Sequence, residues 1–477
     1  MTAQDDPDAY TSPLVARYAG RDMVALWGAR ARALAWRDAW IALAQAEHEL
    51  GAPVTAAQVD ALRRTRDRVD LARVAAIEAE TRHDVMAHVR AWGEVCPEAA
   101  PILHLGATSA FVTDNADAVL IRRGLGLVRA RLVELVRALA DFARREADRP
   151  CLGYTHFQPA QPTTVGKRAA LWLQDVVADL EDVEERWRTF PCRGVKGTTG
   201  TQASFLELLG TEDAVEALDR RVAELLGFAR SVRLAGQTAP RKLEARLADA
   251  LAGVGVTLHK LGTDARLLAH TGELREAFGK QQVGSSAMPY KRNPMKAERL
   301  CALARLALRG RDALVDTAAV QWLERSLDDS AARRVAIPEL FLAVDGALRT
   351  ALDLVRGLEV DAEAVSGLLD REAPFLAVEK LLVLGVRRGG DRQALHEALR
   401  EHAVASRRAP SPGQAFRAAL AADPLFAPLA GDLERLVQPE GLVGLAPQQV
   451  RRYLREVVDP LLAARGDVAL ADVAPAI

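Results

Sequence analysis

Five long segments in the middle of the chain repeat their apolar residues at alternating steps of three and four positions. In the first segment Leu125, Val128 and Leu132 follow this spacing, and Leu247 and Leu251 begin a similar series in the third. Such spacing places one apolar seam along a helix and favours near-parallel packing of long helices. We therefore predict an all-α chain with a central bundle of five long helices, near 115–148, 163–190, 242–270, 293–320 and 336–360.

Composition and chain breaks indicate three helical domains. Of the 477 residues, 49% are hydrophobic and only 5% are aromatic, which suits long helices better than β-sandwiches or barrels. One boundary near 108–112 and another near residue 361 separate shorter helices from the bundle. The predicted domains are an N-terminal helical domain (1–111), the long-helix bundle (112–361) and a C-terminal helical domain (362–477).

Further apolar residues on the first long helix predict that several copies of the chain associate. Leu127, Val133 and Val136 lie outside the seam and widen the apolar face. A helix that is apolar on more than one side is buried on more than one side. We therefore expect an oligomer in which bundles pack side by side.

The charge and cysteine patterns exclude several classes of partner. The chain carries 63 basic and 64 acidic residues, a net charge of −1, so no overall field attracts nucleic acid or an anionic membrane. Its four cysteines lie far apart, the N-terminus lacks an apolar signal segment, and no uninterrupted apolar run of 18 residues occurs. His83 and His88 have no nearby cysteine and form no HExxH motif, which argues against a metal site. We expect a soluble cytoplasmic protein with no metal, cofactor, nucleic-acid or membrane partner.

The segment Gly284–Pro294, with the sequence GSSAMPYKRNP, is the strongest candidate for chemistry. It combines serine hydroxyls with the cations Lys291 and Arg292, and Asn293-Pro294 can cap and start the helix that follows. Backbone N–H groups and the dipole at a helix N-terminus favour anions, so the segment could hold a dicarboxylate or activate a serine. Composition alone leaves a plain surface connection between two helices equally open.

The order of these residues is similar to the signature GSSxMPxKxNP of the fumarase/aspartase superfamily. Within that superfamily, the chain resembles the adenylosuccinate lyase family over nearly its full length. The motifs that carry this closer resemblance are Lys291–Pro294, Arg82–Asp84, Thr155–Gln161 and Trp322–Ser330. The resemblance implies a C–N lyase that releases fumarate by β-elimination. Its implied substrates are adenylosuccinate, which leaves AMP, and the succinyl-aminoimidazole-carboxamide ribotide of purine biosynthesis.

The resemblance also implies the catalytic residues. Ser285 matches the base that removes the Cβ proton, His156 matches the acid that protonates the departing nitrogen, and Glu298 matches the residue that orients this acid. Lys291 and the N–H groups of its segment are suited to stabilising the negative charge that develops. Histidine fits the acid because its unperturbed pKa lies near neutrality. Without the resemblance, a lone histidine such as His156 is more typical of a hydrogen-bonded structural residue.

The same resemblance assigns the substrate contacts and the assembly. It implies a homotetramer whose active sites each draw residues from three chains, with His156 and Ser285 of one site on different subunits. Without it, each arginine would be interpreted as part of a solvated helix face. The expected nucleotide contacts are Arg17, Tyr18, Arg325, Ser330 and Arg334; the expected contacts of the succinyl part are Thr108, Ser109, Gln237, Asn293 and Arg299; further substrate-binding residues are Arg82, His83, Asp84 and Thr155.

Two other functions stay open at this point. One is a sister lyase that acts on argininosuccinate or another N-succinyl compound, although the cluster Arg325–Arg334 favours a phosphorylated substrate. The other is a non-catalytic helical scaffold. A scaffold would be expected to have lost its acid or its base, whereas His156, Ser285, Lys291 and Glu298 are all present.

Overall fold

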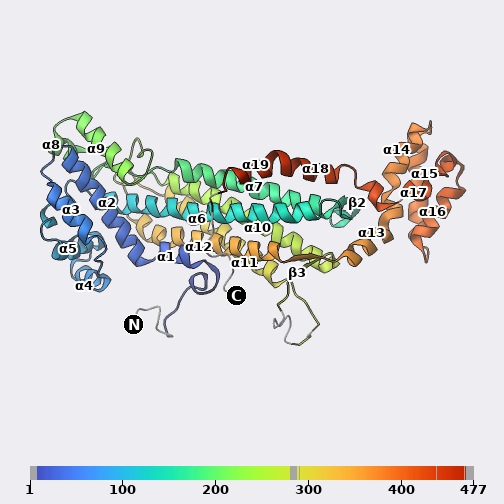
Figure 1. The fold of residues 1–477 in the computed structure, drawn as a ribbon, viewed down its shortest axis with the longest axis horizontal. Helices are drawn as coiled ribbons and strands as arrows, with labels where there is room; N and C mark the ends of the chain where they lie inside the picture. The colour runs from blue at the N-terminus through green and yellow to red at the C-terminus, as the bar shows by residue number, and fades with distance from the viewer. Residues whose placement is uncertain (1–7, 280–286, 289, 437, 467, 469–477) are drawn as a thin grey trace.

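Long helices lie side by side along the longest axis and form the middle of the molecule (Figure 1). This computed structural model describes residues 8–279, 287–288, 290–436, 438–466 and 468. The central helices are α6 (Ser109–Arg145), α7 (Val165–Thr189), α10 (Lys242–Thr271), α11 (Met295–Ala319) and α12 (Asp328–Arg356). The prediction of a mostly helical fold with long central helices is confirmed.

The apolar seams form the interior of the bundle. Leu125, Val128 and Leu132 on α6 are fully buried, and Leu247 and Leu251 on α10 join the same core. Burying one such side chain stabilises a fold by roughly 1.5–3 kcal/mol. The regular spacing of these residues therefore holds the helices together over their whole length.

The residues expected to widen the apolar face of α6 are covered within the single chain. Val133 and Val136 are 0% exposed, and Leu127 packs against the same core. α6 packs against α2, α7 and α12, which accounts for its broad apolar surface. The interpretation of these residues as a surface for other copies is therefore wrong, and the association of several copies stays a prediction.

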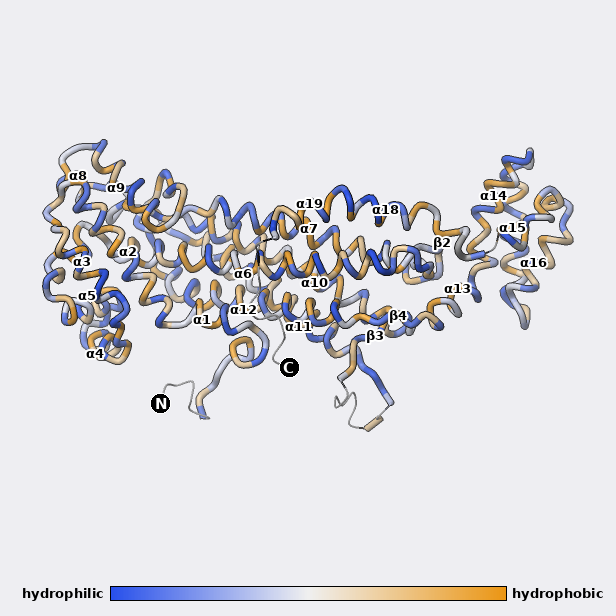
Figure 2. Tube along the Cα trace, in the orientation of Figure 1, coloured by the Kyte–Doolittle hydropathy of each residue, from blue (hydrophilic) through white to orange (hydrophobic). Residues whose placement is uncertain are grey.

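Other apolar residues of the bundle do face outward. Apolar and polar residues alternate along the central helices (Figure 2), and some large apolar side chains stay exposed. They include Leu171 on α7, Val256 and Leu267 on α10, Leu306 on α11 and Val335 on α12. No helix in the described part of the chain is long and apolar enough to cross a membrane.

α12 begins at Asp328, well before the start that the sequence predicted near residue 336. The helix continues through Pro338, which has no N–H and cannot bond the Arg334 carbonyl four residues earlier. Residues 328–335 are mostly polar and precede this proline, so the apolar spacing gave no sign of a helix there. The early start places Ser330 and Arg334 on the first turns of α12.

Shorter helices pack together at the end of the bundle where α6 begins (Figure 1). A second apolar core joins them, in which Trp40 and Trp92 are almost fully buried. The elements at this end are α2 (Ala29–Glu49), α3 (Ala56–Thr65), α4 (Leu71–Thr81), α5 (Asp84–Val95), η2 (Ala100–Ile102), α8 (Ala203–Leu209) and α9 (Glu212–Leu225). η1 (Leu14–Tyr18) and α1 (Arg21–Leu26) precede them and pack against α12 and the core of the bundle.

The opposite end carries the C-terminal helices, and the last of them return along α7 (Figure 1). Arg465, which follows them, donates through Nε to Glu184 on α7 at 2.7 Å. The domain boundaries at 111 and 361 stay a prediction. The elements of this part are α13 (Ala362–Leu376), α14 (Val378–Arg387), α15 (Arg392–Ser406), α16 (Pro412–Ala422), η3 (Pro424–Leu429), α17 (Leu433–Leu436), η4 (Pro439–Leu442), α18 (Ala446–Tyr453), η5 (Leu454–Val458) and α19 (Asp459–Ala463).

Short antiparallel strand pairs interrupt the helical fold, which the all-α prediction did not include. β1 (Pro150–Thr155) pairs with β2 (Gln158–Thr164), and β3 (Leu274–Glu276) pairs with β4 (Leu358–Val360). Pro159 and Pro162 argue against a strand in a wide sheet, because proline has no N–H to donate. A two-stranded ribbon has only edge strands, so β2 can contain both prolines.

Glu47 on α2 is a buried acid within the N-terminal core. Its side chain is 1% exposed, and neither carboxyl oxygen has a hydrogen-bond partner among the described residues. Burial raises the pKa of this carboxyl to about 8. In the unfolded chain this carboxyl ionises at a much lower pH. Glu47 therefore lowers the free energy of unfolding as the pH rises.

Glu47→Gln should therefore raise the free energy of unfolding relative to the wild type. This gain should grow by about 1.4 kcal/mol per pH unit between about pH 5 and pH 8. Below this range both residues are neutral, and above it the gain is constant. Thermal unfolding midpoints of the variant and the wild type at pH 5 and pH 8 measure the effect. Glu80→Gln, at an exposed position on α4, serves as the control. A gain that does not change with pH would contradict the buried, unpaired state of Glu47.

Candidate active site

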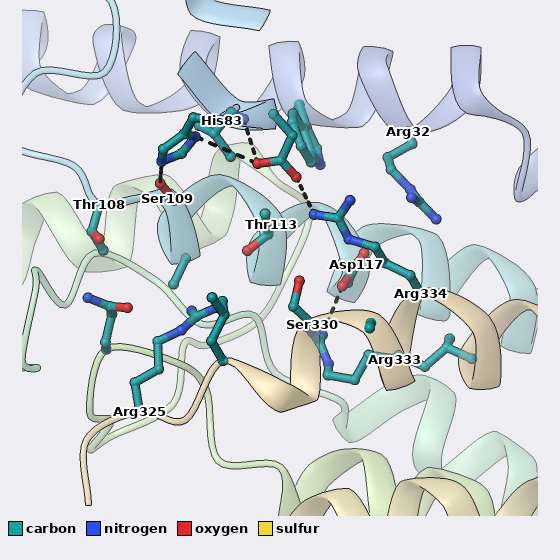
Figure 3. Close-up of a pocket in the computed structure, with 18 of the residues that line it drawn as sticks. Arg32, His83, Thr108, Ser109, Thr113, Asp117, Arg325, Ser330, Arg333 and Arg334 are labelled. Atoms are coloured by element: carbon teal, nitrogen blue, oxygen red, sulfur yellow. Dashed lines mark hydrogen bonds and ion pairs between the residues drawn. The ribbon is translucent and has the colours of Figure 1, made fainter. Parts of the chain in front are cut away.

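A cavity of about 920 Å³ opens where the N-terminal helices meet the bundle, between the starts of α5, α6 and α12 (Figure 3). Gln237 and Arg325 reach it from the connections that precede α10 and α12. The structure thus brings together residues from distant parts of the sequence. Most substrate contacts expected from the sequence line this cavity: Arg82, His83, Asp84, Thr108, Ser109, Gln237, Arg325, Ser330 and Arg334.

Helix N-termini place several of these polar groups. His83 is the N-cap of α5, and its Nδ1 accepts the Met86 N–H at 3.4 Å. The other ring nitrogen of His83, Nε2, lies 3.5 Å from the Ser109 hydroxyl oxygen. Thr108 is the N-cap of α6. The N-termini of α5 and α6 therefore both lie at the cavity, an arrangement that favours anions.

One ion pair crosses the cavity. Arg334 on α12 donates to the carboxylate of Asp84 at the start of α5 (Figure 3). Burial disfavours the ionised form of Asp84, but the hydrogen bond and charge of Arg334 outweigh it and hold the pKa of this carboxyl below its usual value. Both side chains keep solvent contact, with exposed fractions of 47% for Arg334 and 22% for Asp84. An anionic ligand can therefore compete with Asp84 for Arg334.

Beneath the cavity lies a group of ion pairs, the floor network, which joins three helices. Arg241 donates to Asp114 from Nη1 at 3.1 Å and to Asp329 from Nε at 2.8 Å. Arg333 donates to Glu244 from Nε at 2.9 Å. The floor network consists of Asp114 and Asp117 on α6, Arg241 and Glu244 at the start of α10, and Asp329 and Arg333 on α12.

The opposite charges of the floor network keep Asp114 ionised. Burial disfavours the charged form of Asp114, but Arg241 and Arg333 outweigh it, so the pKa of Asp114 lies below its usual value. The Asp329 side chain is 0% exposed, and its Oδ1 lies 3.8 Å from Nη2 of Arg325. Arg325 therefore stands between the floor network and the cavity.

Backbone contacts hold the connection that carries Gln237. Its N–H donates to the Glu324 carbonyl at 3.0 Å, and its own carbonyl accepts Arg193 Nε at 2.8 Å. The Ala239 N–H donates to Asp114 at 2.7 Å, so this connection is also tied to the floor network. Sequence reasoning missed Arg241 and assigned no role to Arg333. The sequence alone does not distinguish a buried arginine from a solvent-exposed one.

The expected acid lies at a different place. His156 and Phe157 form the turn between β1 and β2, with positive φ angles of 53° and 56°. Left-handed backbone at both positions is typical of a type I′ turn and costs about 1 kcal/mol or more for each residue other than glycine. The hairpin packs against α13, and both His156 and the neighbouring Thr155 are exposed. The turn therefore presents His156 to solvent at the end of the bundle away from the cavity (Figure 1).

The start of α11 carries other expected catalytic residues. Lys291 and Glu298 are exposed there, and Asn293 and Arg299 are half-buried. The helix does begin directly after Pro294, as predicted. Ser285 lies outside the described residues.

The N-terminal cap of α11 differs from the prediction that Asn293-Pro294 would provide it. Pro294 occupies the N-cap position, and its side chain has no group that can accept a helix N–H. Glu276 on β3 accepts the N–H groups of Lys296 and Ala297 at 2.9 Å and 2.8 Å. A carboxylate from another segment thus provides this cap.

A single chain does not unite the cavity with the expected acid. α6 begins at the cavity with Ser109 and ends at Arg145, shortly before the hairpin that carries His156. A helix of 37 residues spans roughly 55 Å, so almost the whole bundle separates the two places. Within the described residues, these expected residues do not line the cavity: Arg17, Tyr18, Thr155, His156, Lys291, Asn293, Glu298 and Arg299.

Comparison with known proteins places the chain in a family. A family model described as Lyase matches residues 19–307, and one described as Adenylosuccinate lyase C-terminus matches residues 374–453. The chain is 46% identical to adenylosuccinate lyase of Saccharomyces cerevisiae over 467 residues, which cover 96% of each chain. The chain belongs to the adenylosuccinate lyase family. It is also 43% identical to the adenylosuccinate lyase of Schistosoma mansoni, over 96% of this chain and 97% of the relative.

The fold of this family member also occurs in solved structures with other names. The crystal structure of 3-carboxy-cis,cis-muconate lactonizing enzyme from Pseudomonas putida matches with a TM-score of 0.80 at 27% identity, over 94% of this chain and 99% of that chain. Fumarate lyase from Mesorhizobium sp. BNC1 matches with a TM-score of 0.80 at 25% identity, over 92% and 99% of the two chains. Because differently named enzymes share this fold, the fold alone does not fix the reaction.

Arg333→Met should lower the free energy of unfolding by about 3–5 kcal/mol, because Glu244 and Asp117 lose their cation in a buried setting. Arg334→Met should change it by less than about 1 kcal/mol, since the ion pair with Asp84 is partly exposed. Urea unfolding of both variants, followed by circular dichroism, measures the two losses. Equal losses in the free energy of unfolding would contradict the claim that Arg333 is part of a buried network whereas the ion pair of Arg334 is weak enough for a ligand to replace.

Proposed function

We propose that this chain cleaves adenylosuccinate into AMP and fumarate by β-elimination. We propose that it cleaves the succinyl-aminoimidazole-carboxamide ribotide of purine biosynthesis in the same way. The observation that carries this proposal is the 46% identity to an adenylosuccinate lyase over 96% of both chains. The cavity supports it, because arginines and helix N-termini gather there as a phosphorylated dicarboxylate requires.

The proposed reaction needs a base, an acid and a stabiliser of negative charge. Ser285 takes the Cβ proton of the succinyl group, and the resulting negative charge spreads into the adjacent carboxylate, where Lys291 stabilises it. The C–N bond then breaks, its electron pair stays on nitrogen, and the His156 imidazolium gives that nitrogen a proton. Glu298 orients His156 and favours its charged form.

The cavity is proposed to bind the nucleotide and part of the succinyl group. Ser330 and Arg334 lie on the first turns of α12 and Arg325 on the connection before it, and an arginine fork matches phosphate oxygens. Arg334 would exchange its present partner Asp84 for the phosphate. Ser109 lies within reach of the same ligand, because it shares the cavity with Arg334 (Figure 3).

We propose that each active site is completed by other copies of the chain, in a homotetramer. The distance of roughly 55 Å along α6 between the cavity and the hairpin supports this, because β-elimination needs acid and base at one substrate. The exposure of His156 and Glu298 supports it as well, since both side chains are open to a second copy. Exposed apolar residues such as Leu306 and Val256 lie on bundle helices that could pack against that copy.

The wild-type protein should convert adenylosuccinate to AMP and fumarate, which the change in ultraviolet absorbance measures. It should leave argininosuccinate unchanged, because that compound lacks the phosphate that Arg325 and Arg334 are proposed to bind. Arg334→Met is the matched test of this contact. It should raise the KM for adenylosuccinate by about tenfold or more, since a charge-assisted hydrogen bond is worth about 1.5–3 kcal/mol. Turnover of argininosuccinate in place of adenylosuccinate would contradict the proposed substrate.

A further inference from the structure

The first turn of α11 is capped by a residue from a distant part of the chain. Glu276, the last residue of β3, accepts the N–H groups of Lys296 and Ala297 at 2.9 Å and 2.8 Å. These are N–H groups that a helix cannot satisfy with its own carbonyls. Pro294 occupies the N-cap position without a side-chain acceptor. The Glu276 carboxylate therefore does what a serine or aspartate at the N-cap usually does, and its charge suits the positive end of the helix dipole.

Glu276 is itself held in place by the surrounding structure. Its strand pairs with β4, and the next residue, Ala277, donates its N–H to the Gly357 carbonyl at 2.8 Å. From the other side, Lys296 Nζ lies 2.5 Å from Asp353 on α12. The cap is thus anchored to the end of α12, and it holds the first turn of α11 in a fixed position relative to the bundle.

That turn carries Glu298, which the proposed mechanism assigns to orienting the acid. Glu298 follows the fully buried Ala297, and its N–H bonds the Pro294 carbonyl at 3.0 Å. Burial raises the pKa of Glu276, and the nearby charge of Glu298 raises it further. The two hydrogen bonds from the helix N–H groups lower this pKa but do not cancel the rise. Fraying of the first turn would move Glu298, while the helix from the buried Leu300 onward would stay packed.

We propose that Glu276 is a positioning residue of the active site, which fixes the first turn of α11 and thereby directs Glu298 toward the catalytic acid. The inference rests on the proposed function, because it uses the role of Glu298 in that reaction. A cap that only stabilises the helix would act independently of Glu298. A dependence on Glu298 therefore separates the two roles.

A double-mutant cycle with Glu276→Ala and Glu298→Gln tests this dependence, with steady-state kinetics on adenylosuccinate. Glu276→Ala should lower kcat about tenfold and change KM less than about twofold, because a lost helix cap corresponds to about one factor of ten. In the Glu298→Gln background, the same change should lower kcat less than about twofold. The pH–rate profile of Glu276→Ala should shift in the same direction as that of Glu298→Gln.

Glu359→Ala is the matched control, because Glu359 is an exposed acid on the neighbouring strand β4 and should be replaced without loss of kcat. Equal losses of kcat in both backgrounds, or an unshifted pH–rate profile, would overturn the inference.

Glu276→Gln keeps one acceptor oxygen, so it replaces Glu276→Ala in the same cycle, with a smaller expected effect, if the alanine variant does not fold. A wild-type protein without activity on adenylosuccinate would contradict the proposed function, so the two failures are distinguishable.

Discussion

The ion pairs of Arg241 and Arg333 with the carboxylates beneath the cavity are the interaction on which the rest of the structure depends. They join α6, α10 and α12 at one end of the bundle, where the apolar seams alone would allow the helices to slide. Taking several charges out of water is costly unless each has a partner, so the network holds only when Asp114, Asp329 and Glu244 are all in place. The floor of the cavity is therefore fixed before any ligand arrives, and Arg325 and Arg334 are presented from a rigid base.

The same long helices that make this base rigid also separate the functional groups. α6 places the cavity at its start and the His156 hairpin after its end, roughly 55 Å away along a straight helix. The hairpin turn holds His156 in a left-handed conformation and projects it outward, at a cost that a turn without function would avoid with glycine. Each chain thus carries the proposed functional residues at separate places: the cavity residues at one end of the bundle, His156 at the other, and Lys291 and Glu298 at the start of α11.

The sequence predicted the features that depend on local periodicity or on motifs. The long helices followed from apolar spacing, and the cavity residues were named by a family resemblance. Tertiary contacts decided the rest. Val133 is apolar because α6 is surrounded within one chain, and Arg333 is buried because acids on other helices neutralise it, which no local pattern reveals. Pro159 concealed a strand and Pro338 concealed a helix start, because each proline fits its place only through a specific neighbourhood.

Subunit complementation tests most directly the proposal that the acid and the base of one active site come from different chains. His156→Gln and Ser285→Ala proteins should each be inactive, and after subunit exchange their mixture should regain about a quarter of wild-type activity, because random assembly leaves that share of sites with both residues intact. Native mass spectrometry confirms the exchange, and a mixture of either variant with the double variant is the control that stays inactive. If exchange is demonstrated and the mixture of the single variants stays inactive, the acid and the base come from one chain, and the proposal that they lie on different chains is wrong.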